Sequence, residues 1–376
     1  MTSVSDQSTN LDWVDALRGL AILGVISVHV SLKFPDIPAV ALTPFSFGQM
    51  GVQLFFMASA FTLSLSWEKT QARNKSNSKL EFFLRRVFRI APCYYFGIIL
   101  YFLLSIAESF VRLHSLYPNP DYNVINILAN IFFLHGFIPP SNNTIVPGGW
   151  SIGTEFTFYG LFPFIIDRYL KFSSRNLAFS LLLPSLAFFS SFCVWTFFLL
   201  SNNERINNSF WYYNIITQIG CFLGGISLYS TMKMKSNPTF PRLATIIFVS
   251  SIALAICAFH YFQNQVLFLA VLPISTLAFA SLAFLVRYGI CNWSIIQYIG
   301  RLSFSIYIIH FSVIYFLGMA LKMYFPLWRG NFFVFLICLL CVTSFSTLMA
   351  SIIHRFIEIN GINWGKKFIS KLRVNN

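Results

Sequence analysis

The chain has 376 residues, of which 56% are hydrophobic and only 10% are charged, and its mean hydropathy is +0.68. Since soluble domains carry about 25% charged residues, this composition excludes an ordinary soluble protein and indicates a membrane protein. The formal net charge of +14 requires no nucleic-acid partner, because the membrane orientation described below accounts for it.

The first apolar stretch, residues 14–33, follows a polar segment with no positively charged start, and no small-residue cleavage pattern comes after it. We therefore predict a retained helix and not a signal peptide. Windows of about 20 residues predict ten spans in all. In chain order they are 14–33, 47–66, 87–107, 149–167, 177–200, 211–229, 243–261, 265–286, 297–319 and 331–354. The shorter run 124–138 is interpreted as a re-entrant helix, an interfacial helix or an eleventh span.

The basic residues orient these spans. If the N-terminus is cytoplasmic, the inner connections and the C-terminal tail hold 19 Lys and Arg residues, and the outer connections hold five. The five outer residues are Lys33, Arg112, Arg205, Lys322 and Arg329. Because cytoplasmic segments carry the excess of Lys and Arg, we predict that both termini are cytoplasmic and that the number of spans is even. Most of the inner basic residues are expected to contact anionic membrane lipids.

The predicted fold class is therefore all-α, a polytopic membrane protein of about ten transmembrane helices. It forms a single domain over residues 1–376, with a short polar segment at 1–11 and a basic tail at 357–376. The seven Cys residues show neither paired spacing nor metal-type clustering, so we predict no disulfide framework and no metal site. The oligomeric state is left open.

The first span carries two ionisable residues on one face. Arg18 and His29 are eleven residues apart, which places them about 20° apart around a helix and about 16 Å apart along it. Charged and ionisable groups are costly in hydrocarbon, so two of them on one face predict a functional site that lines a protein or water cavity.

A cluster of arginines lies at the cytoplasmic start of the third span, in FFLRRVFRIAPCYY. It consists of Arg85, Arg86 and Arg89, of which the last two are neighbours on a helix. Guanidinium groups bind phosphate oxygens in a bidentate way. The cluster therefore predicts either a site for a phosphorylated cytoplasmic ligand or a group that only orients the span.

Other spans supply further ionisable groups. Glu155 is the only carboxylate well inside a predicted span, and it is either a functional group or a structural counter-ion. Tyr307 and His310 share a face of the ninth span and either line a site or pack in the core. Helix rise places these groups at overlapping depths around the midplane, with a basic mouth on one side and an aromatic mouth on the other.

Four stretches together resemble the acyltransferase 3 family of bacterial integral-membrane acyltransferases, which modify sugars of lipopolysaccharide, peptidoglycan, other glycans and some small molecules. They are LDWVDALRGLAILGVISVHV, GVQLFFMASAFTLSLS, RRVFRIAP and GGWSIGTEFTFY. IGRLSFSIYIIHF and RFIEINGINWGKK stand where the family has its late motifs, so the resemblance covers nearly the whole chain. One departure is Ala60, where the family usually has Gly. Ala is small enough that we expect close helix packing to remain.

The resemblance implies roles for individual residues. Arg18 and His29 match an Arg and a His that are essential in the family. Arg86 and Arg89 match an Arg-x-x-Arg pair associated with the acyl-coenzyme A donor, beside Arg85. Further candidates for lining the site are Trp150, Ser151, Tyr307 and His310.

The implied activity is membrane-bound O-acyl transfer in the bacterial inner membrane. An acyl group, expected to be acetyl, moves from cytoplasmic acyl-CoA to a hydroxyl of a cell-surface saccharide such as O-antigen or another exported glycan, lipid-linked or not. Acyl-CoA is a co-substrate, and no permanently bound cofactor is expected. Because the chain ends soon after the tenth span, delivery of the acceptor is expected to rely on the membrane part or on a partner.

Such a transfer needs a base for the hydroxyl proton and donors for the developing oxyanion. His29 is the expected base, Glu155 would orient it or hold the acceptor hydroxyl, and Arg18 would bind donor phosphate or stabilise charge. Direct transfer and a covalent acyl-His relay both remain open. The outer connection 108–148 is expected to meet the acceptor. Its candidate sugar-binding residues are Tyr117, Tyr122, His135, Asn142 and Asn143.

Two other interpretations use the same residues. In a proton-coupled transporter or exporter, the intramembrane His, Glu and Arg would relay protons, although no repeat between the two halves is visible. A scaffold for glycan synthesis without chemistry would leave the shared face of Arg18 and His29 unexplained.

Overall fold

The protein is described here from a computed structural model, which is helical throughout with no strand in its described residues. Those residues are 11–73, 78–114, 116–173, 176–202, 207–234, 240–263, 265–324 and 328–374. The all-α fold class is thereby confirmed.

Each of the ten predicted spans corresponds to a long helix. These helices are α1 (Asp12–Ser31), α3 (Gly51–Arg73), α4 (Ser78–Leu113), α6 (Trp150–Ser173), α7 (Leu177–Asn202), α9 (Ile215–Met234), α10 (Phe240–Tyr261), α11 (Val271–Arg287), α13 (Ser303–Tyr324) and α14 (Phe332–Ile353). Nine stretches of the described chain are long and apolar enough to cross a membrane, and α6 is the helix outside that set. Its apolar character is diluted by Thr154, Glu155 and Asp167, which explains why its composition alone is less decisive. The chain is a multi-pass membrane protein.

The predicted ninth span began too early. The structure divides it at Leu302 into a short helix, α12 (Ser294–Arg301), and α13. α12 packs closely on α1, because a Cβ atom on Gly300 would lie 1.7 Å from the carbonyl oxygen of Asp15. Only glycine permits this approach, and the contact fixes the N-terminal half of α1, where Arg18 lies.

The run 124–138 does not cross the membrane. It forms α5 (Val124–Ile131) and a 3₁₀ turn, Leu134–Gly136. Eight residues of helix span only about 12 Å, which is far less than a hydrocarbon core of about 30 Å. The segment packs against α6 through Gly136, where a Cβ atom would lie 2.9 Å from the carbonyl carbon of Gly153.

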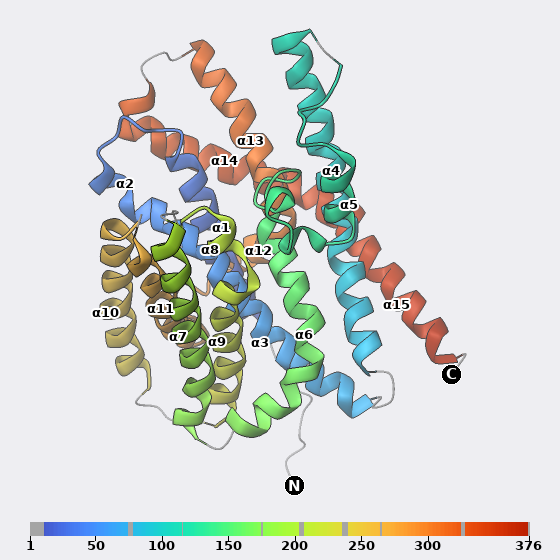
Figure 1. Ribbon diagram of the computed structural model, residues 1–376, viewed down its shortest axis with the longest axis vertical. Helices are drawn as coiled ribbons and strands as arrows, with labels where there is room; N and C mark the ends of the chain where they lie inside the picture. Colours follow the sequence, from blue (N-terminus) through green and yellow to red (C-terminus); the bar gives the residue numbers. More distant parts are fainter. Residues whose placement is uncertain are drawn as a thin grey trace.

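Figure 1 shows α7, α9, α10 and α11 gathered on one side of the molecule, α4 on the other, and α3 and α6 between them. The remaining short helices are α2 (Ala39–Ser46) and α8 (Phe210–Tyr213). The close packing expected at Ala60 is present, since Ala60 is fully buried and its Cβ atom lies 2.9 Å from a Cβ built on Gly225 of α9.

The basic tail 357–376 is largely helical. It forms α15 (Ile359–Val374), which follows α14 after a π-helical turn and runs beside the first half of α4 (Figure 1). The two helices meet at Gly361 and Gly365, where a Cβ atom would collide with Pro92 or Phe88 of α4. This packing brings the basic side chains of the tail next to the arginine cluster of α4.

Candidate active site

Five helices surround a narrow inner cavity of about 80 Å³. α1, α3, α4, α6 and α13 supply its walls, with Arg18, Ser59, Arg86, Arg89, Ser151, Glu155, Tyr159 and Tyr307 as its polar lining. The structure thus brings together candidates that are up to 289 residues apart in the sequence. Three guanidinium groups beside one carboxylate make this cavity suited to an anionic or strongly polarised ligand.

Glu155 is held by two hydroxyl groups that the sequence analysis missed. Its Oε1 atom accepts hydrogen bonds from Ser59 Oγ and from Tyr159 Oη, both at 2.5 Å. Tyr159 stands one helical turn after Glu155, and Ser59 lies in the quoted stretch GVQLFFMASAF, so the spacing and the motif were signals for them. Glu155 does not contact His29, so the predicted role of orienting that imidazole is not supported by the arrangement.

Arg18 lines the inner cavity and is held by two partners in the protein. Its guanidinium group donates to Thr62 Oγ1 at 3.1 Å and lies 3.5 Å from a carboxylate oxygen of Asp15. Its side chain is 17% exposed, which shows that the residue is mostly enclosed by protein. These two partners leave part of the planar guanidinium group facing the cavity.

Arg86 and Arg89 have few partners in the protein. Arg86 makes one long contact, 3.4 Å from Nη2 to Ser66 Oγ, and its buried Nε atom has no partner. Arg89 makes no hydrogen bond or ion pair to any part of the chain that the structure describes. A buried guanidinium nitrogen without an acceptor is costly, so this pair fits a ligand that supplies the missing acceptors.

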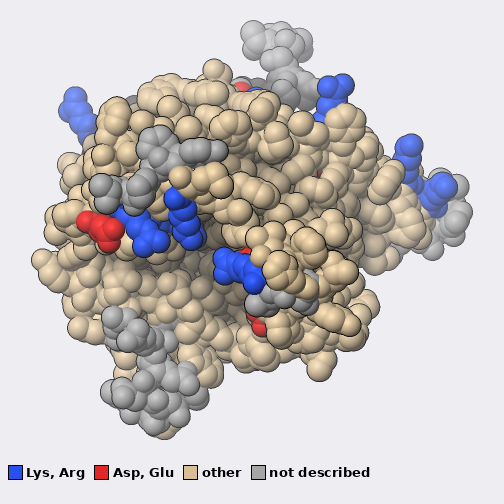
Figure 2. Space-filling model, turned by 90° about the horizontal axis from the view of Figure 1, so that it is seen from above, with Lys and Arg blue, Asp and Glu red and all other residues tan. Residues whose placement is uncertain are grey.

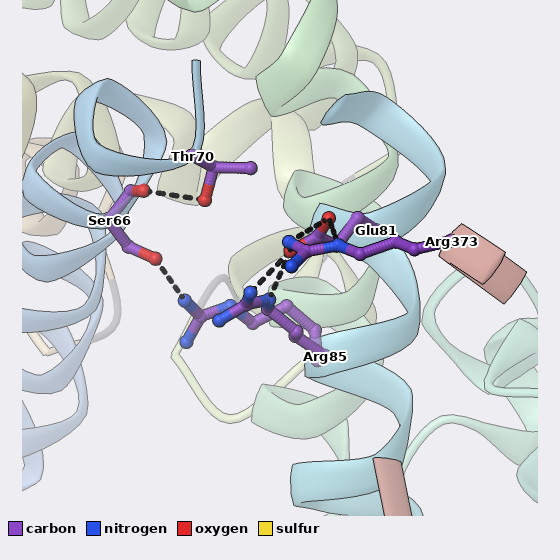
Figure 3. Close-up of polar contacts among 6 residues, drawn as sticks. Ser66, Thr70, Glu81, Arg85 and Arg373 are labelled. Atoms are coloured by element: carbon purple, nitrogen blue, oxygen red, sulfur yellow. Dashed lines mark hydrogen bonds and ion pairs between the residues drawn. The ribbon is translucent and has the colours of Figure 1, made fainter. Parts of the chain in front are cut away.

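Arg86 and Arg89 also line a second space, a groove of about 370 Å³ between α4 and α15. It is here called the cytoplasmic groove after the side on which the predicted orientation would put it. Lys366 and Arg373 of α15 lie on its other side. Figure 3 shows Glu81 held between Arg85 and Arg373, and the Arg373 Nη2 atom lies 2.6 Å from both Glu81 oxygens.

Arg85 itself is bonded to Glu81 and lines the groove but not the inner cavity. Of the three arginines predicted to bind the donor, Arg86 and Arg89 are therefore better placed for a ligand that enters the inner cavity. Arg85 orients Glu81 within α4, and Glu81 in turn binds Arg373 of α15.

His29 lies elsewhere, in a cavity of about 730 Å³ between α1, α4, α13 and the connection that follows α4. It is here called the outer cavity after the side that the predicted orientation gives it. Its imidazole contacts His310, with 3.2 Å between His29 Nδ1 and His310 Nε2. His310 Nδ1 lies 2.8 Å from the carbonyl oxygen of Tyr307. Arg18 and His29 thus line two different cavities, although they share the helix α1.

For two neutral rings, these distances assign the ring protons. A carbonyl oxygen only accepts, so His310 Nδ1 carries a proton and its Nε2 atom is an acceptor. His29 Nδ1 must then donate to His310, which leaves a free lone pair on His29 Nε2. Because the hydrogen bond at one ring nitrogen sets the role of the other, His310 prepares His29 to accept a proton.

Tyr307 lies at the boundary between the two cavities. Its hydroxyl donates to the Gly148 carbonyl at 2.9 Å and accepts from Ser151 Oγ at 2.8 Å. It lines the inner cavity, while the neighbouring Pro147 lines the outer one. Ser151 and Tyr307 thus line the inner cavity as predicted, whereas His310 lines neither cavity and contacts His29, the Tyr307 backbone and Phe311.

Trp150 does not line the inner cavity, contrary to the expectation. Its ring stacks on Tyr213 at 4.4 Å between centroids and meets Phe56 edge to face. An indole at the first residue of α6 fills the space between that helix, α3 and α8, and so holds Glu155 in position through the backbone.

The outer connection is more deeply packed than its sequence suggests. His135 is fully buried and its Nε2 atom lies 2.9 Å from the Gly149 carbonyl oxygen, and Asn142 is buried as well. Burial lowers the pKa of His135, so its ring stays neutral. Tyr117 and Tyr122 do line the outer cavity, and burial raises the pKa of Tyr122 to about 12, so it offers a neutral hydroxyl.

The chain is similar to known acyltransferases. A family model described as an acyltransferase domain matches residues 11–351. Two similar proteins are the O-acetyltransferase OatA of Staphylococcus aureus, 25% identical over 370 residues and covering 93% of this chain, and the peptidoglycan O-acetyltransferase OatA of Listeria monocytogenes, 24% identical over 390 residues and covering 95%. The matches take up 56% and 57% of those two proteins, so this chain spans little more than half their length. No solved structure gives a significant match.

Proposed function

Since the chain belongs to the acyltransferase 3 family, we propose that it is a membrane-bound O-acetyltransferase. In this proposal an acetyl group moves from cytoplasmic acetyl-CoA to a hydroxyl of a cell-surface saccharide, such as O-antigen or another exported glycan. The single observation that carries the proposal is the series of three spaces along the molecule. They are the cytoplasmic groove, the inner cavity and the outer cavity.

The donor side of the proposal rests on the arginines. Arg86 and Arg89 line both the groove and the inner cavity, so they can bind phosphates in the groove while a thin chain extends inward. A cavity of about 80 Å³ has room for the acetyl thioester end of the donor and excludes a nucleotide, so the rest of the pantetheine arm would lie toward the groove. Arg18 and Arg86 would then stabilise the negative charge that develops on the thioester oxygen.

The acceptor side rests on His29. In direct transfer, the free Nε2 atom of His29 removes the proton of the acceptor hydroxyl, and the hydroxyl oxygen forms a bond to the acetyl carbonyl carbon. The carbon–sulfur bond breaks, and the proton on His29 passes to the thiolate of CoA. Because Tyr307 and the Gly148 turn stand between the cavities, a relay through His29 is the second route. His29 Nε2 bonds to the acetyl carbon as the carbon–sulfur bond breaks and CoA leaves as a thiolate. The acceptor hydroxyl then bonds to the acetyl carbon as the carbon–nitrogen bond breaks, and its proton passes to the thiolate.

The setting follows from the same orientation. With the arginine-lined groove in the cytoplasm and His29 toward the outside, acetyl-CoA stays in the compartment where it is made. The proposal therefore places the protein in the bacterial inner membrane, with acetyl-CoA as a co-substrate.

The proposal is tested by incubating purified protein in lipid nanodiscs with acetyl-CoA radiolabelled in its acetyl group. We expect consumption of the thioester, release of free CoA, and label in an acceptor saccharide or in acetate. A protein that leaves the thioester intact in the presence of membrane glycans would contradict the acyltransferase and favour the proton-coupled transporter. Label trapped on the protein and lost in His29→Ala would select the relay over direct transfer.

A further inference from the structure

The outer basic residues gather at one place. The sequence puts five Lys and Arg residues on the outer side, and the outer cavity or the groove beside it is lined by four of them. They are Lys33, Arg112, Lys322 and Arg329. The fifth, Arg205, lies outside the described residues. Because outer segments of membrane proteins are poor in Lys and Arg, their concentration around one opening indicates a binding function.

The groove beside the outer cavity, here called the side groove, has a volume of about 520 Å³. It lies between α4 and α13, whose outer ends stand apart at the top of Figure 1. Its walls are apolar, with Leu104, Ala107 and Val111 on α4 facing Gly318 and Met319 on α13. Val111 is 72% exposed, so the groove opens at the outside of the helix bundle, where lipid would lie.

The two spaces adjoin. Lys33, Leu104 and Ile314 line both, so a ligand lying in the side groove reaches the cavity that contains His29. Figure 2 looks down on this end of the molecule and shows Lys and Arg side chains at the margin of a central hollow.

The charges favour an anion. Arg112 is paired with Glu108 at 2.8 Å, while Lys33, Lys322 and Arg329 form no ion pair within the described part of the chain. Glu108 is the one acidic residue in either lining. Three unpaired cations beside an apolar wall match a phosphate group joined to a hydrocarbon chain.

We infer that the acceptor is a saccharide linked through a phosphate or pyrophosphate to a long apolar chain, and that it enters sideways from the outer leaflet. The chain would lie in the side groove, the phosphate among Lys33, Lys322 and Arg329, and the sugar in the outer cavity near His29. This inference rests on the proposed function, because it takes the acetylation of a sugar from it. The chemistry of the acceptor is inferred from the residues that line the side groove and the outer cavity.

The test uses purified protein in phosphatidylcholine nanodiscs and measures binding of radiolabelled farnesyl phosphate and of farnesol. We expect farnesyl phosphate to bind more tightly, and the double variant K322Q/R329Q to weaken that binding about tenfold or more, since each juxtamembrane cation contributes appreciably to anion binding. The matched control R355Q/K367Q removes two exposed cytoplasmic charges away from both linings and should bind like the wild type.

Two results would overturn the inference. One is equal binding of farnesyl phosphate and farnesol, or equal losses in both double variants. The other is displacement of farnesyl phosphate by an equal concentration of phosphatidylglycerol, which would make the groove a general site for anionic lipid headgroups. Acetyl-CoA consumption is measured in the same samples. Intact thioester turnover with failed probe binding rejects this inference alone, whereas absent turnover rejects the proposed function.

Discussion

The inner and outer cavities differ in size and in the ionisable groups that line them. The inner cavity is narrow, about 80 Å³, and is lined by three arginines and one carboxylate among apolar residues, whereas the outer cavity has about 730 Å³ and places His29 among aromatic and apolar residues, with Lys33, Glu108 and Arg112 also in its lining. Both are bordered by α1 and α13, with Arg18 and Tyr307 at the inner cavity and His29 at the outer one.

Under the proposed function, this difference would let one helix bundle separate a charged donor from a saccharide acceptor. Arginines hold anions in a small space, and a small space excludes the water that would hydrolyse a thioester. A larger space with a neutral imidazole suits the bulkier partner. Variants on either side should therefore affect different kinetic constants, and the following experiments test that separation.

The largest effect is expected for His29→Ala. Removal of a general base costs about 10²- to 10⁴-fold in rate, and an acetyl relay through the same ring would be lost altogether. The measurement is ester-linked acetate in cell-envelope glycans, released by mild alkali, at matched protein levels. Donor affinity should stay unchanged, because His29 does not line the inner cavity.

His260→Ala is the matched control for this variant. His260 lies near the end of α10 and bonds to Thr43 at 2.9 Å, away from both cavities. Near-normal acetylation in His29→Ala, or equal losses in the two variants, would remove His29 from the chemistry.

The next largest effect is expected for Arg86→Ala on the donor side. Loss of charge-assisted hydrogen bonds to phosphate should raise the KM for acetyl-CoA about 10- to 100-fold, with a smaller change in kcat. Lys at this position should restore only part of the affinity, since it lacks the planar fork. Isothermal titration with CoA measures the binding directly.

Arg85→Ala serves as the comparison for Arg86→Ala, because Arg85 is bonded to Glu81 and lies outside the inner cavity. Its effect on CoA binding should be clearly smaller. If the two variants weaken CoA binding equally, the groove and not the inner cavity determines donor affinity. The assignment of the donor to the inner cavity would then be wrong.

A third effect, about tenfold on kcat, is expected at His310, whose role is to position His29. His310→Gln keeps a hydrogen-bond acceptor, while His310→Leu removes it at similar size. We expect the Leu variant to lose more activity than the Gln variant and to change the pH dependence of kcat. Without an acceptor at position 310, the His29 ring can adopt the tautomer that carries its proton on Nε2, which cannot act as a base. Equal activities and unchanged pH profiles would make His310 a packing residue.

Much of the fold could be predicted from the sequence because apolar runs of about 20 residues have few alternatives in a membrane. All ten predicted spans are helices. The break at Leu302 was missed although α12 is amphipathic, with Gln297 and Arg301 beside its isoleucines, and the close contact with α1 at Gly300 could not be seen in the sequence. The position of α15 could not be predicted either. It depends on Gly361 and Gly365, which allow close contact with Pro92 and Phe88 of α4.

The candidate site was predictable only in part. Shared faces within one helix, such as Arg18 with His29, follow from helix geometry. Partners on different helices depend on packing, so the bonds from Ser59 to Glu155 and from His29 to His310 could not be read from spacing. For the same reason the sequence did not show that Arg18 and His29 belong to two cavities.

The smallest effect is expected for Arg373→Gln at the cytoplasmic groove. Arg373 shares Glu81 with Arg85, and its side chain is 42% exposed, so solvent screens its charge. Partly exposed ion pairs contribute little, and the KM for acetyl-CoA should rise only about two- to fivefold. Lys371→Gln, on the same helix but outside the groove lining, should leave the KM unchanged.

Neither Arg373 nor Lys371 lines the outer cavity or the side groove. Farnesyl phosphate binding should therefore not change in either variant. A loss of both donor and farnesyl phosphate binding in Arg373→Gln would mean that α15 supports the whole bundle, and that the groove cannot be treated as a separate part of the donor path.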